Sequence, residues 1–136
     1  MILRTADGLN GTVFFGGLSH LQGWTSVDTI DWVNFEKVWM VAGTVVRVEE
    51  FPEARKPAYK SWVDFGPYGE RKTSAQVTEL YAPKDLIGRQ IIGVINLHEK
   101  QVGPFRSQFL LTGLPTLGGV VITTVERVVP NGTRLA

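Results

Sequence analysis

The sequence predicts an all-β protein built on a five-stranded barrel with one short helix and an N-terminal extension. Its 136 residues are enough for one domain with one hydrophobic core. β-Branched or alternating segments recur with short connections, which is typical of a small barrel. A lone helical segment between the third and fourth strands is the OB-fold pattern. We therefore expect an OB-fold barrel.

The first two predicted strands carry the clearest pattern. The segment MVAGTVVRVEEF is rich in β-branched residues, and Gly43 inside it indicates a bulge or a sharp bend. The segment YKSWVDFG alternates, so that every second residue lies on the same face of the predicted strand: Tyr59, Ser61, Val63 and Phe65. Asp64, Gly66, Pro67 and Gly69 then predict a turn region.

The other predicted strands are IIGVINL, SQFLLTGL and GGVVITTV, with Pro115 and Gly118 as turn residues between the last two. TSAQVTELYAPKDLIGRQ predicts one or two short helical turns bounded by Pro83 and Gly88. DTIDWVNFEKVW predicts another, with Asp28 or Asp31 as its cap. The side chains expected to face inward from it are Phe35, Val38 and Trp39.

Residues 1–34 differ from the rest of the chain and predict an extension before a domain that spans 35–136. The opening thirty residues are rich in glycine and show no long period, so we expect little regular structure there beyond one short strand at GTVFFGG. From Met1 to Glu36 there is one basic residue against four acidic ones, a net charge of −3; from Lys37 to Ala136 there are thirteen against nine, a net charge of +4. Any attraction for phosphate therefore lies in the domain.

The composition argues against several classes of protein. Cysteine is absent, so the chain has no disulfide framework or thiol nucleophile. His20 and His98 lack metal-ligand spacing, and GLPTLGG fails the phosphate-loop pattern. We expect no enzymatic activity, no cofactor and no metal. Because no signal peptide or span-length apolar run is found, we expect a cytoplasmic protein with no membrane span.

Cationic and aromatic residues remain as the candidate binding groups. The cations expected in loops and at strand edges are Arg55, Lys56, Lys60, Arg71, Lys72, Lys100 and Arg106. Phe51, Tyr59, Trp62, Tyr68 and Phe105 are interleaved with them. OB barrels bind oligonucleotides with cations that follow phosphates and rings that stack on bases. On composition alone, the alternative is favoured that these cations are solvated and these aromatic residues belong to the core.

From Phe35 onward the chain resembles the CsaA proteins, which are export-related chaperones with the fold of a tRNA-binding domain. The resemblance rests on FEKV, GTVVRVEEFPEARKPAYKSWVDFG, SAQVTELYAPKDLIGRQIIGVINL, PFRSQFLLTGLP and VPNGTR. The same module is similar to the domain appended to methionyl-tRNA synthetases and to the phenylalanyl-tRNA synthetase β chain. It implies a symmetric homodimer that binds tRNA or other structured RNA, and that holds unfolded or preprotein segments in apolar pockets.

Carried over to this sequence, the resemblance places RNA contacts at Asn96, Lys100, Arg106 and Ser107. Together with the cations of the domain, the expected RNA-binding set is Lys60, Arg71, Lys72, Asn96, Lys100, Arg106 and Ser107. We expect Lys100 and Arg106 to contribute more than Arg55 and Lys56. The expected peptide-binding residues are Trp39, Phe105 and Phe109.

Three departures from the family pattern stand out. The family's Asp-Ile-Arg in the first strand is Trp39, Met40 and Val41 here, so an edge expected to be ion-paired has become apolar. His98 and Glu99 replace prolines of the basic loop. The third departure is the extension, which we expect to pack on the barrel or its dimer mate.

We thus expect a non-enzymatic RNA-binding homodimer of the CsaA type with chaperone activity towards unfolded or export-bound polypeptides. Two rival interpretations stay open. One is a peptide-binding chaperone whose cations only keep it in solution, and the other is a structural domain that recruits a partner enzyme.

Overall fold

The computed structural model describes residues 26–136, which separate into two units, residues 26–38 and Trp39–Ala136. The first unit contains the single-turn helix α3 (Trp32–Phe35), preceded by Asp31 at the cap position without a capping hydrogen bond from its side chain. The prediction that Val38 faces inward is wrong, because its side chain is exposed. A helix of one turn is too short to form an apolar face. The predicted strand at GTVFFGG lies outside the described residues, as do residues 1–25 of the extension.

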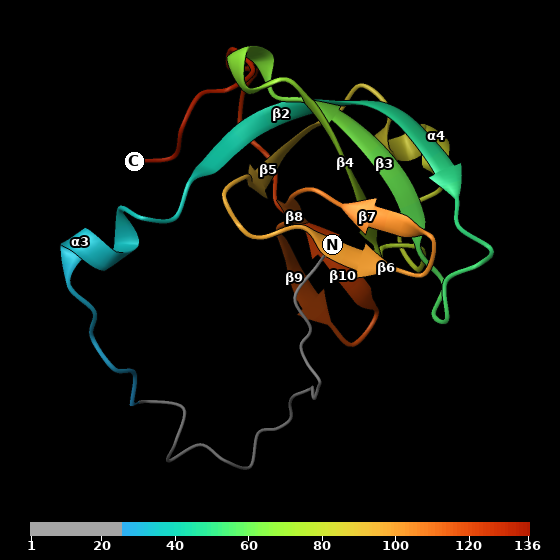
Figure 1. The fold of residues 1–136 in the computed structure, drawn as a ribbon, viewed down its shortest axis with the longest axis horizontal. Helices are drawn as coiled ribbons and strands as arrows, with labels where there is room; N and C mark the ends of the chain where they lie inside the picture. The colour runs from blue at the N-terminus through green and yellow to red at the C-terminus, as the bar shows by residue number, and fades with distance from the viewer. Residues whose placement is uncertain (1–25) are drawn as a thin grey trace. The chain divides into compact units, whose positions relative to one another are not determined.

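The second unit is a nearly closed barrel, which confirms the predicted fold class (Figure 1). Its five-stranded sheet is antiparallel, in the order β4 (Glu70–Ala75), β3 (Tyr59–Asp64), β2 (Met40–Glu50), β5 (Gln90–Val94) and β8 (Leu110–Leu111). The helix α4 (Pro83–Leu86) lies in the chain between β4 and β5, which are the third and fourth strands of this sheet in chain order, as the OB-fold pattern requires.

The remaining elements form two hairpins and one turn. A 3₁₀ turn, η1 (Gly66–Tyr68), connects β3 to β4 at the turn region that the sequence predicts. β6 (Lys100–Val102) pairs with β7 (Phe105–Ser107), and β9 (Gly113–Thr116) pairs with β10 (Gly119–Ile122). The β6–β7 hairpin touches the five-stranded sheet where β7 meets β4.

Two rings and two glycines organise the core. Phe65 and Phe109 are fully buried and meet edge to face, with 4.9 Å between their centroids. A side chain at Gly43 or Gly93 would collide with these rings, because a Cβ atom would lie 2.6 Å from Phe65 at the first position and 2.8 Å from it at the second. Gly43 therefore serves close packing, and the bulge expected there lies further along β2, between Val45 and Arg47.

Irregular segments complete the barrel at both open sides of the sheet. Along the first half of β2, the backbone of Thr133 accepts a hydrogen bond from Ala42, and that of Ala42 accepts one from Gly132. Along β4, Lys72 and Gln108 exchange two hydrogen bonds, since each backbone N–H finds an oxygen of the other residue. These hydrogen bonds satisfy backbone groups that an open sheet edge would expose.

Four details of the predicted strands need correction. β4 was not predicted, because its polar sequence ERKTSA lacks apolar alternation. The predicted strand 107–114 is divided among β7, β8 and β9, with Pro115 inside β9 instead of a turn. The predicted strand 118–125 forms the two-stranded sheet with β9. The departure at residues 39–41 forms no open edge, since Met40 and Val41 pair with β5 on one side and Val41 forms a bridge to Arg134 of the C-terminal segment on the other.

Candidate nucleic-acid interface

An aromatic cluster lies on the outer side of the β2–β3–β4 sheet, separate from the barrel core. Phe51, Ala58 and Phe105 are its buried members, and Trp62 packs against them. The ring of Phe105 is central, with its centroid 5.6 Å from that of Phe51 and 6.0 Å from that of Trp62. Phe105 comes from β7, so the β6–β7 hairpin supplies the residue that completes the cluster. This packing fixes the hairpin against the sheet.

Three cations from three neighbouring strands lie over these rings. The guanidinium carbon of Arg47 is 4.1 Å from the centroid of a Trp62 ring. Lys60 Nζ lies 5.4 Å from the centroid of Phe51 and 5.8 Å from that of Phe105. Lys72 Nζ lies 4.8 Å from the centroid of Phe105. All of these distances are in the range of cation–π attraction. We call Arg47, Lys60 and Lys72 the cation strip.

The register of the strands explains why the cation strip forms. Arg47 of β2 and Lys72 of β4 are both direct partners of Trp62 on β3. Lys60 lies two positions before Trp62 on the same strand and therefore points to the same face. Since neighbouring strands are about 4.8 Å apart, the strip covers a compact area of the sheet.

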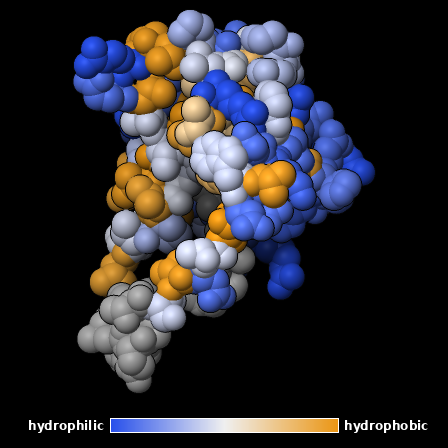
Figure 2. Space-filling model, turned by 90° about the vertical axis from the view of Figure 1, so that its left-hand side faces the viewer, coloured by the Kyte–Doolittle hydropathy of each residue, from blue (hydrophilic) through white to orange (hydrophobic). Residues whose placement is uncertain are grey.

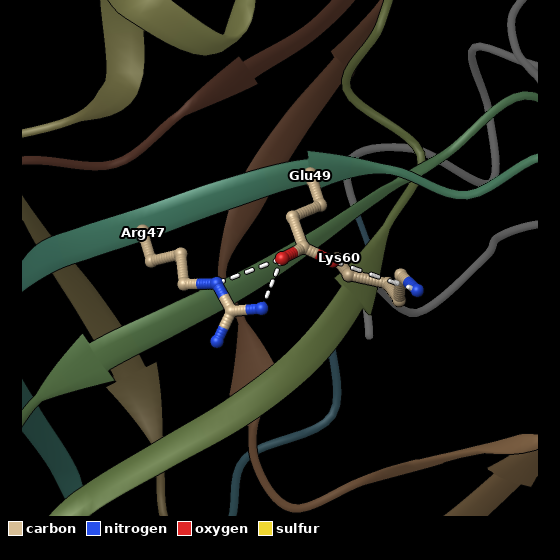
Figure 3. A network of polar contacts seen from close by, with 3 residues as sticks. All are labelled: Arg47, Glu49 and Lys60. Carbon is tan, nitrogen blue, oxygen red and sulfur yellow. Dashed lines mark hydrogen bonds and ion pairs between the residues drawn. The ribbon is translucent and has the colours of Figure 1, made fainter.

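One acid lies within the strip. Glu49 Oε2 accepts a hydrogen bond of 2.8 Å from Arg47 Nε and a second one from Arg47 Nη2, and Glu49 Oε1 lies 3.8 Å from Lys60 Nζ (Figure 3). The carboxylate therefore bridges two of the three cations. The strip retains a net charge of +2.

The two predicted cations of the β6–β7 hairpin are held differently. Arg106 Nε forms an ion pair of 2.9 Å with Glu99 and its Nη1 lies 3.4 Å from Gln101 Oε1. Lys100 is exposed at the start of β6. Because Phe105 packs in the aromatic cluster, the hairpin lies on the same side of the barrel as the cation strip. Among the described residues, however, neither Lys100 nor Arg106 lies over an aromatic ring.

Three other predicted RNA contacts hold the fold together. Arg71 Nη1 donates a 2.6 Å hydrogen bond to the backbone oxygen of Ile95. Asn96 Oδ1 accepts one of 3.0 Å from the backbone N–H of Trp39. Ser107 is fully buried and its Oγ accepts a hydrogen bond from the backbone of Ser74. The polar side chain of Ser107 serves barrel closure and is not on the surface.

The predicted peptide-binding residues do not form one surface. Phe109 is a core residue with 1% of its surface exposed, and Phe105 is buried under the lysines of the strip. Trp39 is partly buried at a different site, where the guanidinium carbon of Arg134 lies 3.9 Å from its ring. This cation–π contact connects the C-terminal segment to the residue before β2.

Sequence reasoning missed Arg47. Strict alternation from the buried Val45 places Arg47 on the core face, whereas the bulge between these residues turns it outward. The interior glycine of the strand signals an irregularity but not its position. Residue alternation alone therefore places Arg47 in the core and leaves it out of the predicted RNA surface.

Other kinds of site find no support in the part of the chain that the structure covers. Across residues 26–136, acidic and histidine side chains form no group that would hold a metal ion. The helices within that range are too short to cross a membrane. A shallow depression of about 360 Å³ lies beside the strip, lined by Phe51, Arg55, Tyr59 and Thr78 among others.

Comparison with known proteins agrees with the arrangement of the barrel. Residues 40–134 match the family model tRNA_bind, described as "Putative tRNA binding domain". The match covers most of the chain. This chain belongs to that tRNA-binding domain family. The domain is similar to the methionine–tRNA ligases of Methanocaldococcus jannaschii (28% identity, 84% of this chain) and Salinibacter ruber (36%, 78%). The chain spans only 17% and 13% of the lengths of these enzymes.

Two solved structures share the fold of the domain over their whole length. The CsaA chaperone of Bacillus anthracis is 40% identical, with a TM-score of 0.76, and the match covers 80% of this chain and all of that one. The CsaA chaperone of Picrophilus torridus is 36% identical with the same TM-score, over 79% of this chain and all of that one. The tRNA-binding domain described here is therefore of the CsaA type in fold and sequence.

Proposed function

We propose that this tRNA-binding domain binds tRNA or other structured RNA through the cation strip. The observation that carries this proposal is the placement of three cations from three strands over one aromatic cluster. Phosphate groups dominate the affinity of proteins for nucleic acids. A cation whose stem already rests on a ring loses less side-chain entropy when it meets a phosphate. A tRNA ligand also favours a cytoplasmic site of action.

The β6–β7 hairpin extends this surface. Lys100 and Arg106 are exposed and come from the element that also supplies Phe105 to the cluster. In this proposal they provide a second set of phosphate contacts beside the strip. Arg71, Asn96 and Ser107 contribute through the hydrogen bonds to the backbone that keep the barrel closed.

The experiment that tests RNA binding is a titration with tRNA and with an unfolded polypeptide at several salt concentrations. Affinity for tRNA should fall linearly on a log–log plot as salt rises, because binding to phosphates releases counterions. Capture of an unfolded polypeptide by apolar surface should weaken little. The proposal fails if tRNA binding is absent at low salt, or if it does not respond to salt.

We further propose that the domain forms a homodimer, which the exposed apolar residues of the β9–β10 hairpin support. Leu117 is fully exposed between the strands, Leu114 is 58% exposed and Val121 is 37% exposed. Leu80 is also exposed and lies beside the hairpin, since its side chain is next to Gly119. Monomeric proteins rarely leave such apolar groups uncovered, and a two-fold axis would pair the hairpin with its own copy.

Sedimentation of the purified protein tests the dimer, with a mass of two chains expected at micromolar concentration. The variant Leu117→Lys should shift the mass towards one chain, because it places two like charges near the axis. Val128→Lys is a matched control, since Val128 is also exposed but lies outside the hairpin. Equal effects of both substitutions would refute an interface at the hairpin.

A second candidate function is chaperone activity, favoured by the similarity to two proteins named CsaA chaperones. The apolar groups available for a polypeptide are distributed over the surface. On the face drawn in Figure 2, hydrophobic residues lie in separate groups among hydrophilic ones. Suppression of aggregation of an unfolded client at high salt, where RNA binding is weak, separates this activity from RNA binding.

A further inference from the structure

The ion pairs around Glu49 have the geometry of an occupied anion site. Two hydrogen-bond donors on one side of the Arg47 guanidinium, Nε and Nη2, converge on a single oxygen of Glu49. The other oxygen of the same carboxylate faces Lys60 (Figure 3). One carboxylate therefore occupies the point at which the donors of two cations meet. A guanidinium donates hydrogen bonds to a phosphate in the same way that it donates them to a carboxylate.

The cations of this site are held by groups other than Glu49. Arg47 lies over Trp62, and the stem of Lys60 is largely covered, with 22% of its side chain exposed above Phe51 and Phe105. Glu49 itself lies at a half-buried position of β2, with 39% of its side chain exposed. Removal of the carboxylate would thus leave the two cations near their present places.

We propose that Glu49 is an internal competitor for phosphate, which a phosphate of the bound nucleic acid displaces from Arg47 and Lys60. This inference rests on the proposed RNA-binding function and names the residue that limits its affinity. The exchange costs little, because an ion pair at the surface contributes little to the stability of a protein. Glu49 returns to water and the phosphate takes over the donors that the carboxylate has occupied.

Because Glu49 occupies the donors of Arg47 and Lys60, it also makes the site selective for ligands with several phosphates. An isolated phosphate must displace Glu49 for a single contact, whereas a nucleic-acid strand also reaches Lys72 and the hairpin in the same event. Neighbouring contacts on one ligand raise the effective concentration of the next phosphate. Mononucleotides and inorganic phosphate should therefore bind poorly to the domain with Glu49 in place.

The test compares Glu49→Gln with the wild type in tRNA binding at four or more salt concentrations. Glutamine has nearly the same shape and removes only the charge. We expect tRNA affinity to rise roughly two- to fivefold at low salt. The slope of log K against log salt should steepen by less than about 0.9, because salt weakens the Glu49 ion pairs of the wild type and so offsets part of its loss of affinity, whereas the variant has no such ion pairs. Inorganic phosphate should also become a more effective competitor of tRNA for the variant.

Glu126→Gln is the matched control, since Glu126 is an exposed acid that pairs with Arg127 and lies outside the strip. It should leave the salt slope within about 0.3 of the wild-type value. An equal gain for both variants would attribute the effect to net charge and overturn the inference. A loss of affinity in Glu49→Gln, matching that of Arg47→Ala, would overturn it as well, because Glu49 would then position Arg47.

The failure of this inference can be distinguished from the failure of the proposed function. If the wild type binds tRNA with a salt slope and Glu49→Gln does not gain affinity, only the competitor role is wrong. If neither protein binds tRNA at low salt while both unfold at the same temperature, RNA binding itself is wrong and the competitor role fails with it.

Discussion

The sheet face and the β6–β7 hairpin both present cations, but they hold them in different ways. Lys60 and Lys72 on the sheet lie over the ring of Phe105. Arg106 on the hairpin is tied to Glu99 of the preceding loop by an ion pair in which both side chains are about half exposed. The sheet therefore holds its cations over rings even where Glu49 also pairs with them, whereas Arg106 of the hairpin relies on an ion pair that salt weakens.

This difference has a consequence for binding. A cation anchored by its stem keeps its charge available and reaches a phosphate with little loss of freedom. Arg106 loses its charged anchor when it gives up Glu99, whereas Arg47 and Lys60 stay over their rings when Glu49 leaves. We expect the strip to supply most of the affinity for RNA and the hairpin to supply a smaller share.

Removal of the ring that links the two regions should have the largest effect. Phe105→Ala deletes a buried ring that packs against Phe51 and Trp62 and supports two lysines. We expect the free energy of unfolding to fall by about 3 kcal/mol. Denaturant unfolding measures this, with Phe105→Leu as the control that should retain much of the stability. A decrease below about 1 kcal/mol would contradict a structural role for the cluster.

The next effect separates the two regions directly. Lys60→Ala combined with Lys72→Ala should lower tRNA affinity about tenfold at moderate salt and reduce the salt slope by about two, because two phosphates are no longer neutralised. Lys100→Ala combined with Arg106→Ala should lower the affinity only about threefold, because Arg106 shares its charge with Glu99. The reverse order of the two double variants would place the main surface on the hairpin.

Residue patterns predicted the class of the fold because they report burial. The alternation of Tyr59, Ser61, Val63 and Phe65 indicated β3 and its core face, and the structure buries all four. α4 is likewise found between the predicted Pro83 and Gly88. Signals of this kind are local, so one sequence suffices to find them.

The parts that could not be predicted depend on interactions between segments far apart in the sequence. β4 is polar because two of its three buried residues, Thr73 and Ser74, make side-chain hydrogen bonds to the segment 107–109 instead of packing apolar surface. The cation strip requires the bulge in β2 and the arrival of Phe105 from another element. A local residue pattern determines neither the register of three strands nor the position of a bulge.

The cations of the 51–58 loop should contribute least among the basic groups, in keeping with the prediction from the sequence. Arg55 and Lys56 are exposed and lie close in sequence to Glu49, Glu50 and Glu53, whose charges partly offset theirs. Arg55→Ala combined with Lys56→Ala should lower tRNA affinity less than about twofold and leave the salt slope nearly unchanged. A decrease as large as that of the hairpin variant would extend the RNA surface over the whole loop.

The smallest effect should come from the acid of the hairpin, and it sharpens the comparison between the two regions. Glu99 pairs with one cation, Arg106, whereas Glu49 bridges two. Glu99→Gln frees a side chain that has no ring beneath it among the described residues, so its added freedom offsets part of the gain. We expect tRNA affinity to rise less than about twofold, below the gain of Glu49→Gln measured in the same titration. A larger gain at Glu99 than at Glu49 would mean that pairing, and not anchoring on rings, limits the cations of this domain.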